Sequence, residues 1–170
     1  MQSRKRLPCL VLFLLSVTGV GISIYLTAVH YAGAPLVCTA SGLVNCERVL
    51  TSGYSSVLGV PVSVGGIAWF GVTGALALVG VLRRPEPALL QPAQIAWSLL
   101  GLASVLYLVG VEVVALGVIC AWCTAAHVLI VATLLVSVLR TPSDAAQGSA
   151  TANRTADSPR RPASRPRAGP

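Results

Sequence analysis

Charged side chains are scarce in this sequence, and their scarcity excludes most classes of soluble protein. Only 10% of the 170 residues are charged, whereas 55% are hydrophobic and the mean hydropathy is +0.79. A soluble domain carries about 25% charged residues, so the composition indicates an integral membrane protein. The net charge of +7 does not indicate nucleic-acid binding, because the basic residues are not clustered with aromatic residues along any one face.

Long apolar runs predict the membrane spans. Residues 7–31 contain no charged residue and exceed the roughly 7 to 15 residues of a signal-peptide core, so we expect a retained first helix. Residues 62–82 form a second run, which starts after Pro61 and ends at Arg83 and Arg84.

The third apolar run is too long for one span. Residues 95–139 contain one charged residue, Glu112. At ~1.5 Å per residue, a helix of this length would be about twice as long as the ~30 Å hydrocarbon core. The midpoint is Gly117, so we expect two spans, 95–116 and 119–139. The predicted fold class is all-α integral membrane, a bundle of four transmembrane helices.

The segments outside the spans have a different composition. Residues 32–60 are rich in Gly, Ser, Thr, Asn and Pro, which predicts a long aqueous loop with a short surface helix over 47–58. Residues 141–170 are rich in Arg, Pro and Ser, which predicts a disordered cytoplasmic tail. We therefore expect one membrane domain, residues 1–140, with no soluble thioredoxin-like domain at either end.

The distribution of basic residues predicts the orientation. Three precede the first span, two lie between the second and third spans, and six lie from Arg140 onward, which leaves only Arg48 on the other side. By the positive-inside rule, both termini are cytoplasmic and the long loop faces outward, where disulfides persist. We expect a multi-pass protein of the inner (plasma) membrane.

Four of the five cysteines form two pairs at the predicted outer face. Cys38 and Cys46 lie in the long loop, and Cys120 and Cys123 form a C-x-x-C in the first turn of the last span. A helix N-terminus stabilises a thiolate. A mobile pair beside a fixed pair can pass electrons by thiol–disulfide exchange. These residues predict an outward-facing thiol relay.

The residues alone leave two other functions open. One is a structural tetraspan membrane protein whose disulfides brace its outer face. The other is a thiol-based metal carrier. A zinc site is disfavoured, because the C-x-x-C lies in a hydrophobic wall with no second ligand pair at finger spacing.

Four segments together resemble the vitamin K epoxide reductase family, most of all its bacterial members: Cys38, CERVLTS at 46–52, VLGVP at 57–61 and YLVGVEVVALGVICAWC at 107–123. The resemblance covers residues 7–139. It implies a four-helix bundle around a quinone of the menaquinone or ubiquinone type, without a metal. It also implies an extracytoplasmic thioredoxin-fold (DsbA-like) partner as electron donor. The implied enzyme is a membrane thiol:quinone oxidoreductase that supports disulfide bond formation.

The resemblance also implies a role for each matching residue. Cys38 would meet the thiols of the partner, and Cys46 would form the disulfide that links the loop to Cys120. Cys123 would face the quinone. Ser52 matches the loop serine of the family, near the loop cysteines and the quinone.

Two polar positions depart from the family pattern. The tyrosine one turn after the C-x-x-C is His127 here, and the asparagine at the start of the second span falls near Val62 and Ser63. His127 follows Cys123 by four residues, so both lie on one helix face. Its imidazole can donate a hydrogen bond or a proton to a quinone oxygen. The alternative is a packed histidine bonded to a neighbouring helix.

The remaining polar and sulfur-containing residues have simpler interpretations. Glu112 serves proton movement or extends its carboxylate to the interface. His30 and Trp122 are interpreted as interfacial residues, and Cys9 as a small buried residue.

Overall fold

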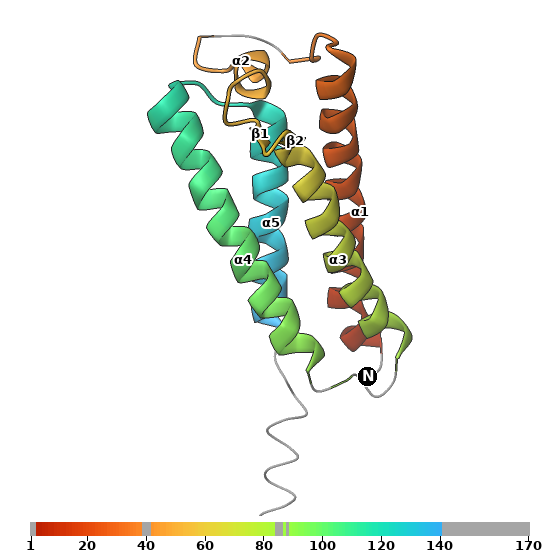
Figure 1. The fold of residues 1–170 in the computed structure, drawn as a ribbon. Helices are drawn as coiled ribbons and strands as arrows, with labels where there is room; N and C mark the ends of the chain where they lie inside the picture. Colours follow the sequence, from red (N-terminus) through yellow and green to blue (C-terminus); the bar gives the residue numbers. More distant parts are fainter. Residues whose placement is uncertain (1–2, 39–41, 84–86, 88, 141–170) are drawn as a thin grey trace, which may run out of the picture. The chain divides into compact units, whose positions relative to one another are not determined.

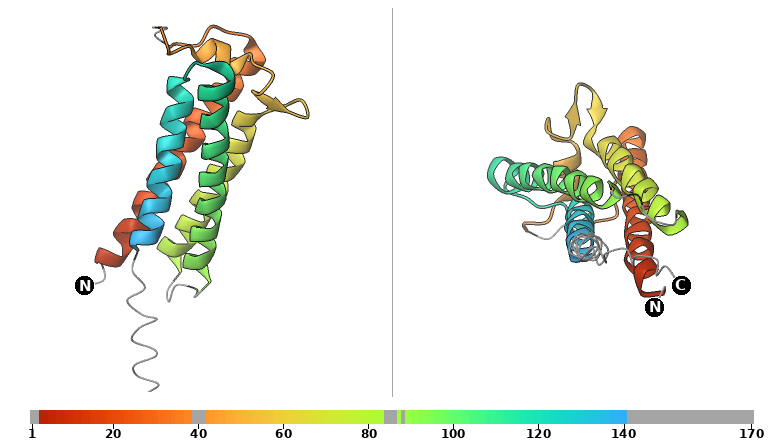
Figure 2. Two further views of the ribbon diagram at one scale, coloured as in Figure 1. Left: turned by 90° about the vertical axis from the view of Figure 1, so that its left-hand side faces the viewer. Right: turned by 90° about the horizontal axis from the view of Figure 1, so that it is seen from below.

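Four long helices dominate the structure, a computed structural model that describes residues 3–38, 42–83, 87 and 89–140. They are α1 (Ser3–Ala32), α3 (Val62–Leu82), α4 (Leu90–Gly110), which continues into the π-helix η1 (Val111–Leu116), and α5 (Ala121–Leu139). Figures 1 and 2 show the four helices running side by side. The predicted all-α bundle of four helices is therefore confirmed.

Each long helix can cross a bilayer. The candidate spans are Leu7–Ala32, Val62–Leu82, Leu90–Leu116 and Ala121–Leu139. Each exceeds the roughly 17 apolar residues that the shortest spans require. Large apolar side chains such as Leu14, Leu106 and Leu135 are exposed on the outside of the bundle, as expected for a surface in contact with lipid. The chain is a multi-pass membrane protein.

Small residues allow α1 and α3 to pack closely. At Gly74 an added Cβ would lie 2.7 Å from the Oγ atom of Ser16, and at Gly66 it would lie 2.7 Å from the Oγ atom of Ser23. Gly71 lies on the same helix but has no atom within 4 Å of the position of an added Cβ. The interface therefore uses only some of the glycines in α3, as is usual for close helix pairs in membranes.

The predicted span boundaries differ from the observed ones at two helix starts. The third span begins at Leu90 instead of residue 95, because Pro92 falls in the first turn, where a helix tolerates proline. The last span begins at Ala121 instead of residue 119, because the backbone of Ile119 pairs with Val44 in an isolated parallel β-bridge.

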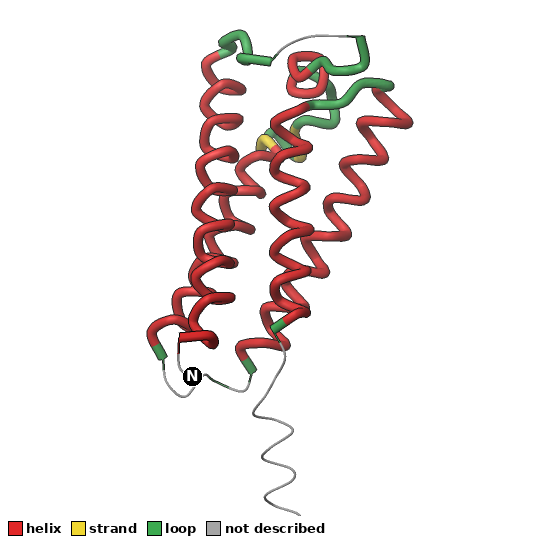
Figure 3. The backbone as a smooth tube through the Cα atoms, turned by 180° about the vertical axis from the view of Figure 1, so that it is seen from behind, coloured by secondary structure: helices red, strands yellow, loops and turns green. Residues whose placement is uncertain are grey.

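The prediction of a surface helix over 47–58 is wrong in extent. The helix α2 covers only Cys46–Leu50, and it is followed by a hairpin of β1 (Ser56–Val57) and β2 (Val60–Pro61) (Figure 3). The hairpin turn is Leu58-Gly59, and both residues have positive φ, as a two-residue I′ turn requires. Because of this turn, α2 does not extend to residue 58, and the chain reaches α3 through the hairpin.

The turn before α5 follows the prediction at Gly117. This glycine has φ 64°, in the left-handed region, and its N–H donates to the carbonyl oxygen of Glu112. The N–H of Val118 donates to the same oxygen over 3.1 Å. Both hydrogen bonds therefore attach the turn to Glu112 of the π-helix.

The loop elements α2, β1 and β2 lie at the same end of the bundle as the start of α5 (Figure 1). The end of α3 and the start of α4 lie at the opposite end. The predicted tail, residues 141–170, lies outside the described residues, so the division of the chain after residue 140 stays a prediction.

Candidate active site

A backbone bridge joins the long loop to the turn before α5. The N–H of Asn45 donates to the carbonyl oxygen of Ile119 over 3.1 Å, and the N–H of Ile119 donates to the carbonyl oxygen of Leu43 over 2.8 Å. Cys46 directly follows Asn45, and Cys120 directly follows Ile119. The bridge therefore brings one cysteine of each pair to the same place, where both are buried.

The loop pair is oxidised and the helix pair is reduced in this structure. Cys38 and Cys46 form a disulfide with their Cα atoms 6.2 Å apart, while Cys120 and Cys123 are free thiols. The disulfide between Cys46 and Cys120 that the resemblance implied is not formed here. Cys46 is instead bonded to Cys38, and Cys120 follows the residue on the other side of the bridge.

Cys120 caps the start of α5. Its Sγ atom accepts the backbone N–H of Cys123 over 3.3 Å, and its side chain is fully buried. The hydrogen bond from the Cys123 thiol, helped by backbone N–H groups at the helix start, lowers the pKa of the Cys120 thiol below its ordinary value. Burial and the charge of Glu112 act against this shift. This position therefore favours the thiolate form of Cys120.

Glu112 joins the π-helix to Cys120. Its carboxylate oxygen Oε2 accepts the backbone N–H of Cys120 over 3.3 Å, while its own carbonyl oxygen holds the turn at Gly117. The side chain is only 5% exposed. The interpretation of Glu112 as a carboxylate that extends to the interface is therefore wrong, because its carboxyl group lies inside the bundle.

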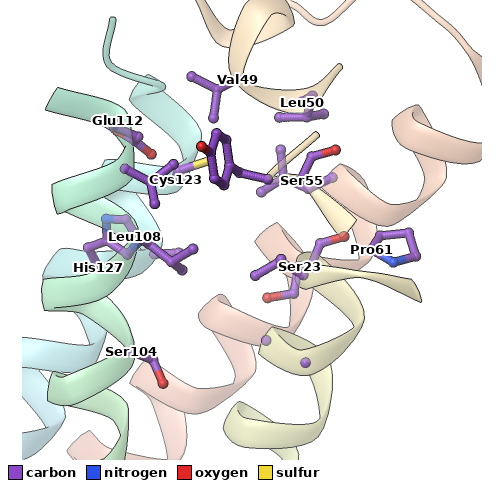
Figure 4. Close-up of a pocket in the computed structure, with 18 of the residues that line it drawn as sticks. Ser23, Val49, Leu50, Ser55, Pro61, Ser104, Leu108, Glu112, Cys123 and His127 are labelled. Atoms are coloured by element: carbon purple, nitrogen blue, oxygen red, sulfur yellow. The ribbon is translucent and has the colours of Figure 1, made fainter. Parts of the chain in front are cut away.

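A cavity of about 370 Å³ lies within the bundle below α2, with Pro61 of the hairpin at its side (Figure 4). Residues of α1, α3, α4, η1 and α5 form its walls, and Val49 and Leu50 of α2 lie above it. All four residues predicted to hold a quinone line this cavity, namely Cys123, His127, Ser52 and Ser63. Glu112 and His30 also line it. Most of the remaining wall is apolar, as is usual for a site that takes an organic ligand.

His127 presents an unpaired polar atom. The residue is 7% exposed, and its Nδ1 atom is buried without a hydrogen-bond partner among the described residues. Buried polar atoms are rarely left unpaired, so this atom fits a ligand oxygen or a water. The two serines have protein partners: Ser52 donates to the carbonyl oxygen of Val49 over 2.8 Å, and Ser63 accepts from Thr27 over 2.9 Å.

Trp122 has a contact that sequence reasoning missed. Its indole N–H donates to the carbonyl oxygen of Val37, the residue before Cys38, over 3.0 Å. The Tyr25 ring lies 5.0 Å from the Trp122 ring, and the Tyr25 hydroxyl accepts the N–H of Val37 over 3.4 Å. The interpretation of Trp122 as only interfacial omits this role, because no local sequence signal links residues so far apart.

The arrangement defines a class of protein. A backbone bridge joins a loop that carries a disulfide to the turn before a reduced thiol pair at a helix start. One thiol of that pair, Cys123, lines an apolar cavity between membrane spans, as in a membrane thiol–disulfide oxidoreductase. In the part of the chain that the structure describes, no group of three His, Cys, Asp or Glu residues is placed to hold a metal ion.

Comparison with known families names the group. The model described as the Vitamin K epoxide reductase family matches residues 10–138. The chain therefore belongs to the vitamin K epoxide reductase family, which confirms the resemblance, and it is a membrane thiol–disulfide oxidoreductase. A comparison with curated proteins gave no match.

Proposed function

We propose that this protein oxidises the dithiol of an extracytoplasmic thioredoxin-fold (DsbA-like) protein and passes the electrons to a membrane quinone. Its physiological task is disulfide bond formation in exported proteins. The observation that carries the proposal is the position of the C-x-x-C. Cys120 lies beside Cys46 across the backbone bridge, and Cys123 lines the cavity.

The loop pair receives the electrons first. The dithiol of the partner reduces the Cys38–Cys46 disulfide, so the partner becomes a disulfide and the loop becomes a dithiol. The Cys46 thiolate then attacks the Sγ atom of Cys120 in the oxidised helix pair and releases Cys123. The Cys38 thiolate attacks Cys46, which restores the loop disulfide and releases Cys120. A loop disulfide beside two free helix thiols is the state of this structure.

The helix pair then gives up two electrons. Cys120 and Cys123 form a disulfide, and a bound quinone would take the two electrons and two protons and leave as quinol. Cys123 is the cysteine that faces the cavity, so it is the one in contact with the ring. The apolar wall suits a quinone ring, and the unpaired Nδ1 atom of His127 suits a quinone oxygen when it carries the hydrogen. Ser52 and Ser63 complete the set that would hold it.

The orientation and the domain boundary belong to the same proposal. Both termini are cytoplasmic, the cysteine pairs are extracytoplasmic, the membrane is the inner (plasma) membrane, and residues 1–140 form the enzyme domain. The eleven basic residues away from the loop support this orientation. Reporter fusions after Arg84 and after Arg140 will read cytoplasmic and one at Ser41 will read outside; an outward reporter at Arg140 contradicts the orientation.

The test uses the purified protein in lipid nanodiscs with a short-chain quinone and a reduced thioredoxin-fold protein as donor. Quinone absorbance will fall in the wild type, and Cys46→Ala will abolish the change with this donor. A small membrane-permeant dithiol will restore turnover in Cys46→Ala, because it reaches Cys120 and Cys123 directly. Full activity of Cys123→Ala with either donor contradicts the proposal.

Cys9→Ser is the matched control. Arg140 donates to the Sγ atom of Cys9 over 3.0 Å, and serine keeps an acceptor at that position. Cys9 takes no part in the relay, so this variant will turn over like the wild type. The same preparation separates the rival functions, because a bracing protein will consume no quinone and a metal carrier will protect its thiols only when metal is added.

A further inference from the structure

Glu112 is a buried acid that the relay described above does not use. It lies in η1, a π-helix, and π-helical turns occur frequently at functional sites. An ionisable residue inside a membrane span is costly, so it indicates a function by default. Its carboxyl group also reaches the two places where the chemistry occurs.

The position of the carboxyl group is the first observation. Oε2 of Glu112 accepts the backbone N–H of Cys120, and Glu112 also lines the cavity together with Cys123 and His127. Figure 4 shows its side chain on the same side of the cavity as Cys123, with His127 one turn deeper. One carboxyl group is therefore hydrogen-bonded to the backbone of Cys120 and also borders the space where a quinone would bind.

The charge of the site is the second observation. The described residues that line the cavity include no Lys or Arg. A Cys120 thiolate and a Glu112 carboxylate would place two negative charges side by side in a medium of low dielectric constant, which is strongly unfavourable. Two acidic groups this close titrate as a pair and hold one proton between them. When Cys120 is the thiolate, Glu112 carries that proton.

We propose that Glu112 is the proton carrier of the helix pair. It takes a proton when electrons arrive from the loop and gives it up when electrons leave for the quinone. This inference rests on the function proposed above. It assigns Glu112 as the catalytic residue that supplies the second proton of the quinol. This role is additional to the hydrogen bond that His127 would donate.

Electrons and protons balance in each step, and the site keeps one negative charge, which is on Glu112 when the helix pair is oxidised and on Cys120 when it is reduced. When the loop dithiol reduces the Cys120–Cys123 disulfide, two thiol protons are released. One goes to Cys123 and the other to the Glu112 carboxylate, which leaves Cys120 as the thiolate. When the helix pair is oxidised again, it gives two electrons. The two protons come from the Cys123 thiol and the Glu112 carboxyl group, so the quinol is complete and Glu112 returns to its carboxylate.

The test compares three substitutions that separate proton transfer from positioning. Glu112→Gln keeps a carbonyl oxygen that accepts the N–H of Cys120 but cannot carry the proton. Glu112→Asp keeps the proton but shortens the side chain. Glu112→Ala loses both. Fully reduced protein is mixed with excess quinone by stopped flow under anaerobic conditions, and both the maximal rate and the quinone concentration for half of it are measured.

Glu112→Gln and Glu112→Ala are each expected to lower the maximal rate by ~10²-fold or more. The quinone concentration for half of the maximal rate is expected to stay unchanged in Glu112→Gln. Glu112→Asp retains more of the rate than Glu112→Gln. Glu47→Gln, the same change at an exposed acid of α2, is the control and keeps the wild-type rate.

A rate for Glu112→Gln equal to the wild type, or above that of Glu112→Asp, overturns the inference, because Glu112 then only positions Cys120. In that case quinol formation by the wild type still supports the proposed function. Absence of quinol formation in the wild type contradicts the proposed function itself, so the two failures are distinct. If Glu112→Gln does not fold, the order of Glu112→Asp and Glu112→Ala decides: equal rates in these two overturn the inference.

Discussion

The indole N–H of Trp122 donates to the backbone carbonyl of Val37 over 3.0 Å, so one of the two residues between the helix cysteines holds the residue before Cys38. Tyr25 of α1 contacts both partners. This clasp, defined by Trp122, Val37 and Tyr25, ties the loop to two helices on one side of the loop disulfide. The bridge between Val44 and Ile119 ties it on the other side. Both attachments keep the loop cysteines beside the helix pair.

Trp122→Phe removes the hydrogen bond of the clasp but keeps a ring beside Tyr25. A hydrogen bond of this kind contributes about 0.5–1.5 kcal/mol, so we expect transfer from the loop pair to the helix pair to slow by ~2- to 10-fold. The measurement is the ratio of turnover with the protein donor to turnover with the small dithiol, which bypasses the loop.

The matched control for this substitution is Trp97→Phe. The indole N–H of Trp97 also donates to a backbone carbonyl, that of Trp69 in α3, over 3.2 Å, away from the cysteines. It is expected to leave the ratio of the two turnover rates unchanged. An unchanged ratio in Trp122→Phe would show that the clasp does not guide the loop.

The pKa of Cys120 predicts how the helix pair responds to pH. Because this pKa is lowered, the thiolate persists at pH values below those at which an ordinary cysteine ionises. Ultraviolet absorbance of the thiolate, in a Cys9→Ser background with the loop disulfide intact, will show this early transition. Cys123→Ala removes the largest cause of the shift, so the transition will move to higher pH. No movement would mean that the Cys123 thiol does not stabilise the thiolate.

His127→Ala tests the residue with the unpaired nitrogen. We expect thiol exchange between the two pairs to continue, while quinol formation slows by ~10²-fold or more, because the oxygen that gains charge loses its donor. His127→Tyr, which introduces the hydroxyl of the family pattern, will recover much of the rate. Stopped-flow absorbance of the three fully reduced proteins compares them. Equal rates would mean that His127 only packs and that Ser52, Ser63 or a water supplies the donor.

Gly74→Ala tests the close packing of α1 on α3. The added methyl group would lie 2.7 Å from the Oγ atom of Ser16, so the serine or the helices must shift. We expect a loss of roughly 1–3 kcal/mol in the free energy of unfolding, measured by denaturation in detergent micelles. Gly71→Ala adds the same methyl group where no atom lies within 4 Å, and it will be nearly neutral. Equal effects of the two substitutions contradict this account of the interface.

Length and composition were enough to predict the four spans, and the second span matched Val62–Leu82 because Pro61 and Arg83 mark its ends. The hairpin after α2 was not predictable, because its strands are two residues long and Leu58 takes a positive φ that disfavours most side chains. The orientation rule indicated that both cysteine pairs face outward. It did not indicate which cysteine of each pair lies next to the backbone bridge.

The rest of the site depends on contacts between distant segments. The bridge between Val44 and Ile119 is formed by backbone atoms, so no pattern of side chains in the sequence predicts it. The depth of Glu112 follows from the π-helix, which directs its carboxyl group to Cys120, and apolar composition does not distinguish a π-helix from an α-helix. His127 was identifiable because it stands where the family has a different polar residue.

The most direct test of the relay is its quinone stoichiometry. A Cys9→Ser protein is fully reduced, freed of reductant without oxygen, and titrated with quinone while quinol is measured by absorbance. Four relay thiols can form two disulfides, so the account predicts two quinols per chain. It predicts one when Cys38 and Cys46 are both replaced by Ala, and none when Cys120 and Cys123 are both replaced. Quinol formation without Cys120 and Cys123, or only one quinol from the protein with all four cysteines, would contradict the relay.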